Sequence, residues 1–244
     1  MNKKRIVFRL LSVISIFLMW QLIAVLMKKS LILPSPVLVI RSLASMVKTS
    51  AFWTASAVTF FRVLASFIIS TVTGILTGFF CGIKKEVKYF LEIPLTIIRV
   101  TPVIAFILFV IYWFSSGIIP VFVCVMMTFP VMVSSVISGF DSFDKKLLDM
   151  AVIFNFSKTD VFKYIKLPQI VPFIKNGIRQ TFGLCWKVVV AGEVISLPHN
   201  AIGTMLQREQ IHLETASVMA LTIFIVAVSF LLEKILGIIL EDRK

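Results

Sequence analysis

The stretch that decides the fold is residues 118–140, IIPVFVCVMMTFPVMVSSVISGF. It contains no charged side chain, and a helix of about 20 apolar residues is enough to cross a hydrocarbon core roughly 30 Å thick. The whole chain of 244 residues shares this character, because 59% of it is hydrophobic and 15% is charged. Soluble domains average about 45–50% apolar and about 25% charged residues. The composition therefore indicates an all-α membrane protein and argues against a soluble enzyme.

Six mostly apolar stretches occur along the chain, of which the fifth is the most polar. The N-terminal run is longer than the ~7–15 residues of a signal peptide and has no small-residue cleavage site, so it is interpreted as an uncleaved span. Pro94 and Pro102 interrupt the region before the third span, which leaves an interfacial piece to about Arg99. Gly74 and Gly78 predict close helix contact on the second span. The predicted spans are residues 10–27, 58–83, 101–114, 118–140, 174–195 and 216–240.

The basic residues predict the orientation of these spans. The net charge of +13 comes from 25 Lys and Arg against 12 Asp and Glu, and basic residues are retained on the cytoplasmic side of a membrane. With the N-terminus inside, the inner segments hold 14 basic residues and the outer loops hold 5. Both termini are therefore predicted to be cytoplasmic, and the charge does not call for a nucleic-acid partner.

The inner loop at residues 141–168 is predicted to form two short helices with a sharp corner. Asp144 is a suitable N-cap for the first helix. Asn155 falls where the first helix must reverse, and Asn often replaces Gly in the left-handed closing position. Ser157, with Asp160 three residues later, is close to a capping box for the second helix. The second helix is expected to end at Leu167, because the residue before a proline avoids helical angles.

This loop resembles the cytoplasmic loop of binding-protein-dependent ABC importer permeases. The family pattern is E-A-A, three residues, G, nine residues, I, one residue, L-P. The spacing is kept throughout, with three identities changed: Asp for Glu, Met for Ala and Asn for Gly. Without the resemblance, short helices that simply close a loop would be favoured. Met150 stands in the second place of the pattern. The resemblance implies a coupling loop for an ATPase, formed by Asp149, Ala151, Asn155, Ser157, Asp160, Ile165, Leu167 and Pro168.

The rest of the chain is similar to the nitrate, sulfonate and taurine branch of that family. The matching stretches are Leu33–Pro36, Arg62–Leu64, Arg99 with Thr101–Ala105, Trp113–Phe114, Trp186–Glu193 and Ile202–Gly203. The resemblance implies one transmembrane domain over residues 1–244, with a five-helix core at about 58–240 and an added N-terminal helix. It also implies a homodimer in the cytoplasmic (inner) membrane, served by two ATPase subunits and an external substrate-binding protein. No G-x4-G-K-[ST] phosphate loop occurs, so ATP hydrolysis is expected in a separate subunit and no enzymatic activity is expected here.

Charged and aromatic residues within the spans are candidates for the translocation path, since a charge in the bilayer interior is costly. Lys187 and Glu193 are about 120° apart on a helix and are not expected to pair with each other. Lys187 could attract an anionic solute, but neutralisation of either residue across a helix contact is favoured. Trp186 is favoured as packing over stacking on a solute. Arg62 and Arg99 are favoured as anchors at the interface, although Arg99 is kept as a path candidate.

Other chemistry finds little support in the sequence, and neither a metal nor a cofactor is predicted. The three cysteines, Cys81, Cys124 and Cys185, lie in apolar runs without ligand spacing. The single Glu209-x-x-His212 is too little for a di-iron site, which needs two such motifs. A secondary transporter driven by an ion gradient remains the alternative, although it would favour inverted repeats that we do not see. A membrane-embedded enzyme would need clustered His, Asp or Glu.

Overall fold

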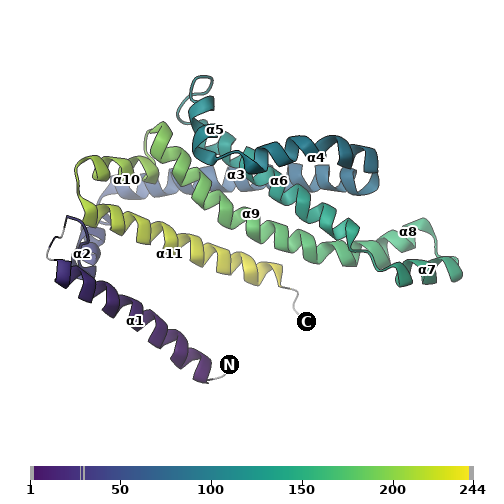
Figure 1. The fold of residues 1–244 in the computed structure, drawn as a ribbon, viewed down its shortest axis with the longest axis horizontal. Coiled ribbons are helices and arrows are strands. Elements are labelled where there is room, and N and C mark those ends of the chain that lie inside the picture. Colours follow the sequence, from purple (N-terminus) through teal and green to yellow (C-terminus); the bar gives the residue numbers. More distant parts are fainter. Residues whose placement is uncertain (1–2, 28, 30, 242–244) are drawn as a thin grey trace. The chain divides into compact units, whose positions relative to one another are not determined.

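The computed structural model describes residues 3–27, 29 and 31–241, and within these ranges the regular structure is entirely helical (Figure 1). The all-α prediction is therefore confirmed. Lys28, Arg243 and Lys244, which contributed to the orientation count, lie outside the described residues. The elements are α1 (Lys3–Met27), α2 (Pro36–Met46), α3 (Ser50–Ile83), α4 (Lys85–Val100), α5 (Val103–Val110), α6 (Ile119–Asp141), α7 (Lys145–Ile153), α8 (Lys158–Asp160), the π-helix η1 (Val161–Lys166), α9 (Leu167–Ser196), α10 (Ile202–Ile211) and α11 (Thr215–Leu240).

The chain divides into two compact units, of which the first comprises Met1–Val58 and His199–Val228. Its core is a cluster of four buried apolar residues, Phe52, Ala55, Ile202 and Leu221. The ring of Phe52 packs edge-on against Phe224, with 4.7 Å between ring centroids. Burial of these side chains holds the beginning of α3 against α10 and α11 within this unit.

The second unit comprises Thr59–Pro198 and Ser229–Lys244, and its main contact is between α6 and α9, which run side by side (Figure 1). Gly177 on α9 allows this approach, because a Cβ there would lie 2.7 Å from Cβ of Ser135. Gly78 on α3 does the same toward α6, since a Cβ would lie 2.6 Å from Cβ of Val136. Gly74 faces Met132 in the same way. The predicted close helix contact at Gly74 and Gly78 is confirmed.

Three helices within the described residues are long and apolar enough to cross a membrane: α3, α6 and α11. A fourth span is obtained if α4 and α5, which are bent by 97° at their junction, are taken together. α9 has 30 residues, but its charges, which include Lys175, Arg179, Lys187 and Glu193, lower its hydropathy. α1 contains a shorter apolar stretch, Ile14–Met27. The described helices thus account for three or four of the six predicted spans.

The break predicted at Pro102 is observed, but the predicted length of the third span, residues 101–114, is wrong. α4 ends at Val100, Thr101 is extended with ψ 125°, and α5 covers only Val103–Val110. Pro102 causes this break, because it pushes the preceding residue out of the helical region and lacks an N–H donor. Eight helical residues are about 12 Å long, which is too short for a hydrocarbon core of roughly 30 Å.

The prediction that the second loop helix ends at Leu167 is also wrong. Leu167 is helical (φ −59°, ψ −46°), and Pro168 lies in the first turn of α9. The chain passes from α8 through the π-helix η1, in which the N–H of Leu167 donates to the carbonyl of Phe162, five residues earlier. The wider π turn accommodates a proline whose ring would otherwise clash with the carbonyl four residues before it. The loop is therefore continuous with α9.

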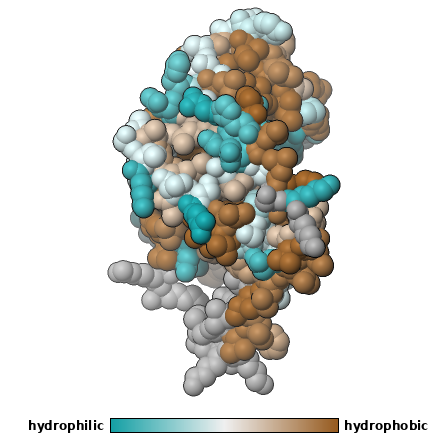
Figure 2. All heavy atoms as spheres, turned by 90° about the vertical axis from the view of Figure 1, so that its left-hand side faces the viewer, coloured by the Kyte–Doolittle hydropathy of each residue, from teal (hydrophilic) through white to brown (hydrophobic). Residues whose placement is uncertain are grey.

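Apolar side chains cover much of the exposed surface. Figure 2 shows one face of the chain, on which apolar residues occupy wide areas between smaller hydrophilic patches. Phe230 and Ile239 of α11 are exposed, as are Phe80 of α3 and Ile93 of α4. Exposed apolar surface on this scale is expected where helices face lipid or a partner.

Candidate functional site

The loop between α6 and α9 has the predicted helix-turn-helix form. The side chain of Asp144 accepts a hydrogen bond from the N–H of Lys146 at 2.8 Å and so caps α7. Asn155 has φ 53°, and the N–H of Phe156 donates to the carbonyl of Ala151 at 2.9 Å. The N–H of Asn155 donates to the carbonyl of Val152 at 3.1 Å. These bonds form a Schellman motif, which confirms the turn predicted at Asn155.

The start of the second loop helix is also as predicted. Ser157 Oγ accepts a hydrogen bond from the N–H of Asp160 at 3.2 Å and donates one to Asp160 Oδ2 at 2.6 Å. Sequence reasoning missed Gln169, whose Oε1 accepts from the N–H of Asp144 at 2.9 Å and whose Nε2 donates to the carbonyl of Ile165 at 3.0 Å. Gln169 therefore joins the first turn of α9 to the beginning of α7. No local pattern signals this role, because the two residues are 25 positions apart.

The loop buries a small interior and exposes an apolar tip. Ala151 and Ile165 are buried, whereas Asp149 is exposed and has no ion-pair partner among the described residues. Met150 is exposed, so the larger side chain in the alanine position of the pattern meets no steric obstacle. Ile153 and Phe154 at the corner are 76% and 67% exposed. An exposed apolar corner on a polar loop is typical of a surface that binds another protein.

A buried ionic cluster joins α3 to α9 in the second unit. Glu193 is fully buried, and its Oε1 lies 2.8 Å from Nη1 of Arg62. Thr59 Oγ1 lies 3.0 and 2.9 Å from the two carboxylate oxygens. The expected neutralisation of Glu193 across a helix contact is therefore observed. Arg62 is not an interface anchor, since it lies within α3 with 14% of its side chain exposed and pairs with Glu193.

The other two candidates on α9 have different surroundings. Trp186 is buried and contacts Phe60, with ring centroids 6.5 Å apart and planes tilted by 43°. Its indole N–H is buried without a hydrogen-bond partner among the described residues. Lys187 is exposed. Packing is thus the observed role of Trp186, and Lys187 does not share the surroundings of Glu193.

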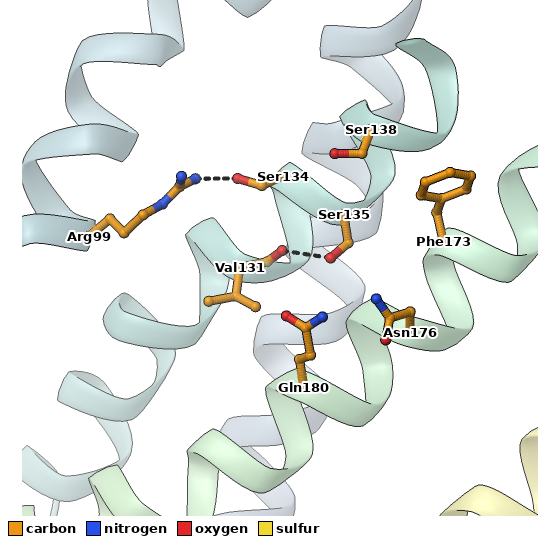
Figure 3. Close-up of a pocket in the computed structure, with 8 residues that line it drawn as sticks. All are labelled: Arg99, Val131, Ser134, Ser135, Ser138, Phe173, Asn176 and Gln180. Atoms are coloured by element: carbon orange, nitrogen blue, oxygen red, sulfur yellow. Dashed lines mark hydrogen bonds between the residues drawn. The ribbon is translucent and has the colours of Figure 1, made fainter. Parts of the chain in front are cut away.

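A polar hollow of about 450 Å³ lies beside α4, α6 and α9. Arg99 of α4 reaches across and donates a hydrogen bond to Ser134 of α6, while Asn176 and Gln180 of α9 point toward the space between α9 and α6 (Figure 3). The lining residues are Arg99, Val131, Ser134, Ser135, Ser138, Phe173, Asn176 and Gln180. Of the four path candidates, all of which are described, Arg99 is the one that lines the hollow.

The hollow combines one cation with hydroxyl and amide groups. The guanidinium of Arg99 has five N–H donors and suits a carboxylate, sulfonate or similar oxyanion. Ser135 Oγ donates to the carbonyl of Val131 at 3.0 Å, and Ser134 Oγ donates to that of Pro130 at 2.7 Å. Sequence reasoning missed Ser134, Ser138, Asn176 and Gln180. A signal was present, because Ser134 and Ser138 are four positions apart on α6, as Asn176 and Gln180 are on α9, and residues four apart share one face of a helix.

A candidate metal centre is not among these features. Within the described residues, no group of three or more His, Cys, Asp or Glu side chains is arranged to hold a metal ion. The described residues form a helical membrane protein that has a polar hollow beside α6 and α9 and a helix-turn-helix loop between those two helices.

The chain belongs to the family of binding-protein-dependent transport system inner membrane components, which matches residues 70–243. It is 25% identical over 223 residues to the taurine transport system permease protein TauC of Escherichia coli, a match that covers 88% of this chain and 80% of TauC. It is 23% identical over 208 residues to an aliphatic sulfonates transport permease of Bacillus subtilis, covering 84% of this chain and 75% of that protein. A nitrate import permease of Synechococcus elongatus is 25% identical over 138 residues, covering 55% and 48%.

The fold has a counterpart among solved structures. The crystal structure of an amino acid ABC transporter has a chain with a TM-score of 0.65 and 17% identity, and the match covers 81% of this chain and 95% of that one. The chain is therefore a multi-pass membrane protein and the permease component of an ABC importer of the nitrate, sulfonate and taurine type. Its family implies an ATPase and a substrate-binding protein as partners.

Proposed function

We propose that residues 1–244 form a single transmembrane domain with six spans, of which about 58–240 make the five-helix core, and with both termini in the cytoplasm. α3, α6 and α11 have the required length and hydropathy, and α9 is long enough to cross despite its charges. The bent pair α4 and α5 supplies a broken span, and α1 supplies the added N-terminal one. The excess of basic residues in the inner segments supports this orientation in the cytoplasmic membrane.

The loop at residues 141–168 is proposed to dock the ATPase subunit. The observation that carries this proposal is the hydrogen-bonded helix-turn-helix with the exposed apolar residues Val152, Ile153 and Phe154 at its corner. Asp149, Asn155, Ser157 and Asp160 are exposed or half-buried around it. Because η1 runs into α9 without a break, movement of the loop would be passed directly into that helix.

The working importer is proposed to contain two copies of this chain, two ATPase subunits and an external substrate-binding protein. The exposed apolar surfaces of the helices leave area for a second copy as well as for lipid. Family membership favours this assembly over the ion-gradient-driven alternative, because the family works with a binding protein.

The polar hollow is proposed to belong to the translocation path for a small solute with an anionic group. Arg99 would attract the anion, and Ser138, Asn176 and Gln180 would donate hydrogen bonds. Relatives named for sulfonates, taurine and nitrate agree with this charge. The two helices that line most of the hollow, α6 and α9, are joined by the coupling loop, so the loop is well placed to control the hollow. Lys187, Glu193 and Trp186 are assigned to the bundle rather than to this hollow.

The docking proposal is tested with the double variant Asp149→Ala, Ser157→Ala. The variant removes one exposed charge and the cap of α8, so ATPase copurification and ATP-dependent uptake are expected to fall together. Lys187→Gln is the matched control, since it changes a charge on α9 away from the loop, and it is expected to keep ATPase copurification. If the double variant retained both copurification and uptake, the docking role of this loop would be excluded.

A further inference from the structure

A second hollow, of about 510 Å³, lies between the α3–α4 turn and the coupling loop. Its lining includes Lys85, Lys88 and Tyr89 of α4, Asp141 at the end of α6, and Phe162 and Lys166 of η1. Three separate parts of the second unit therefore meet around it. None of these residues lines the hollow at Arg99, and no role in the proposed path requires them.

The charge of this hollow is positive. Lys88 Nζ is paired with Asp141, at 2.9 Å from Oδ1 and 2.7 Å from Oδ2. Among the described residues, Lys85 and Lys166 have no carboxylate within ion-pair distance. Lys166 Nζ lies 5.6 Å from the ring centroid of Phe143. Two unneutralised ammonium groups beside a paired one favour an anion with several acceptor oxygens.

The surrounding helices indicate that the hollow is level with lipid headgroups. α3 is a candidate membrane span and ends at Ile83, two residues before Lys85. α4 is amphipathic: Lys85 and Lys88 lie on its polar face, while Phe90 and Ile93 on the other side are exposed. Lys85 and Lys88 therefore lie in the first turn of the broken span proposed for α4 and α5, at the level where basic side chains reach the lipid headgroups.

We propose that this hollow binds the phosphate of an anionic phospholipid headgroup and thereby fastens the coupling loop to the membrane surface. The proposal rests on the proposed function, because it requires residues 141–168 to lie on the cytoplasmic side. The phosphate lies between Lys85 and Lys166, which belong to α4 and η1. The lipid therefore bridges the first turn of α4 and the helix that carries the coupling loop into α9.

The test compares two matched double variants of the full chain, purified with its ATPase subunits. Lys85→Gln with Lys166→Gln removes the two unneutralised lysines of the hollow. Lys84→Gln with Lys163→Gln removes the same charge at neighbouring positions that do not line it. Each complex is equilibrated with phosphatidylglycerol in phosphatidylcholine nanodiscs, and the phosphatidylglycerol that stays bound after delipidation is counted by native mass spectrometry.

The first double variant is expected to lose phosphatidylglycerol binding by about 10-fold or more. The second is expected to lose it by less than about 3-fold, because the attraction between a lysine and an anionic headgroup falls off with distance and these two lysines do not line the hollow. Equal losses in both variants, or no retained phosphatidylglycerol in the unmodified complex, would overturn the proposal. In a second arm, soluble glycerol 3-phosphate is added to complexes in phosphatidylcholine alone. The bound glycerol 3-phosphate is counted by native mass spectrometry in the same way. Retention of as much glycerol 3-phosphate as phosphatidylglycerol by the unmodified complex would assign the hollow to a free phosphate and overturn the lipid as its source.

Failure of this proposal is distinguishable from failure of the proposed function. ATPase copurification and uptake report on the docking loop, whereas retained phosphatidylglycerol reports on the hollow. A complex that imports solute without retaining the lipid would overturn the lipid site alone. A chain that retains the lipid but binds no ATPase would overturn the docking role alone.

Discussion

Arg62 and Glu193 form an ion pair between α3 and α9, with 2.8 Å between Nη1 and Oε1 and with the carboxylate fully buried. A buried charge is tolerated when it is paired and hydrogen-bonded, and Thr59 supplies the additional hydrogen bond. The pair therefore fixes two helices of the second unit at one point, and truncation of either residue removes this ion pair.

A double-mutant cycle tests this relationship. Arg62→Met or Glu193→Met alone is expected to cost about 3–5 kcal/mol, because each breaks the ion pair and leaves one of its two charges in the helix contact. The double variant is expected to be more stable than either single variant, since it removes both charges. Thermal unfolding of the purified complex measures the four proteins. A double variant with additive losses would show that the two residues do not act as a pair.

The left-handed residue in the loop gives a second prediction. Asn155 has φ 53°. Glycine adopts this left-handed conformation freely, whereas a residue with a Cβ adopts it at a free-energy cost of about 1–2 kcal/mol. Asn155→Gly is expected to keep ATPase copurification at the unmodified level, whereas Asn155→Val is expected to reduce it. Equal binding by the Gly and Val variants would show that the turn geometry does not matter for docking.

The contact between α3 and α6 gives a third prediction. A Cβ at Gly78 would lie 2.6 Å from Cβ of Val136, whereas one at Gly117 would meet nothing within 4 Å. Gly78→Ala is therefore expected to lower stability by about 1–3 kcal/mol through overpacking. Gly117→Ala is the matched control and should leave the thermal unfolding temperature of the complex unchanged. The close helix contact would be contradicted if both variants unfolded at the unmodified temperature.

The loop was largely predictable because its determinants are local. A cap at Asp144, a reversal at Asn155 and a cap at Ser157 each depend on residues within a few positions, and all three are observed. The end of the second helix was not predictable in this way. The π turn of η1 lets the chain pass Pro168, and proline rules alone do not foresee that rearrangement.

The contacts between helices could not be read from the sequence. Arg62 and Glu193 are 131 positions apart, and neither local spacing nor periodicity selects one partner for Glu193. The polar hollow could not be predicted for the same reason, since Arg99, Ser134 and Gln180 come from three different helices. Apolar composition, in contrast, is a property of each stretch by itself, which is why long apolar helices were predicted at α6 and α11 and over most of α3, which begins at Ser50 rather than at Val58.

The hollow at Arg99 gives a fourth prediction. Arg99→Gln is expected to reduce uptake of an anionic solute by about 10-fold or more, because one good charge-assisted contact is lost. Arg99→Lys should keep part of the uptake, and both variants should copurify with the ATPase subunit. Lys187→Gln, away from the hollow, is the comparison. If Lys187→Gln abolished uptake and Arg99→Gln did not, the path would have to be assigned to the exposed face of α9 instead.

The central claim is that residues 141–168 dock the ATPase and so couple it to the permease. Its most direct test is site-specific photocrosslinking from Ile153 at the corner of the loop, which is 76% exposed, with Leu213 beyond α10, which is 65% exposed, as the control position. In intact cells that express the whole importer, a crosslinker at Ile153 is predicted to capture the ATPase subunit, and one at Leu213 is predicted not to. Capture of the ATPase from Leu213 and not from Ile153 would contradict both the docking site and the orientation of the chain.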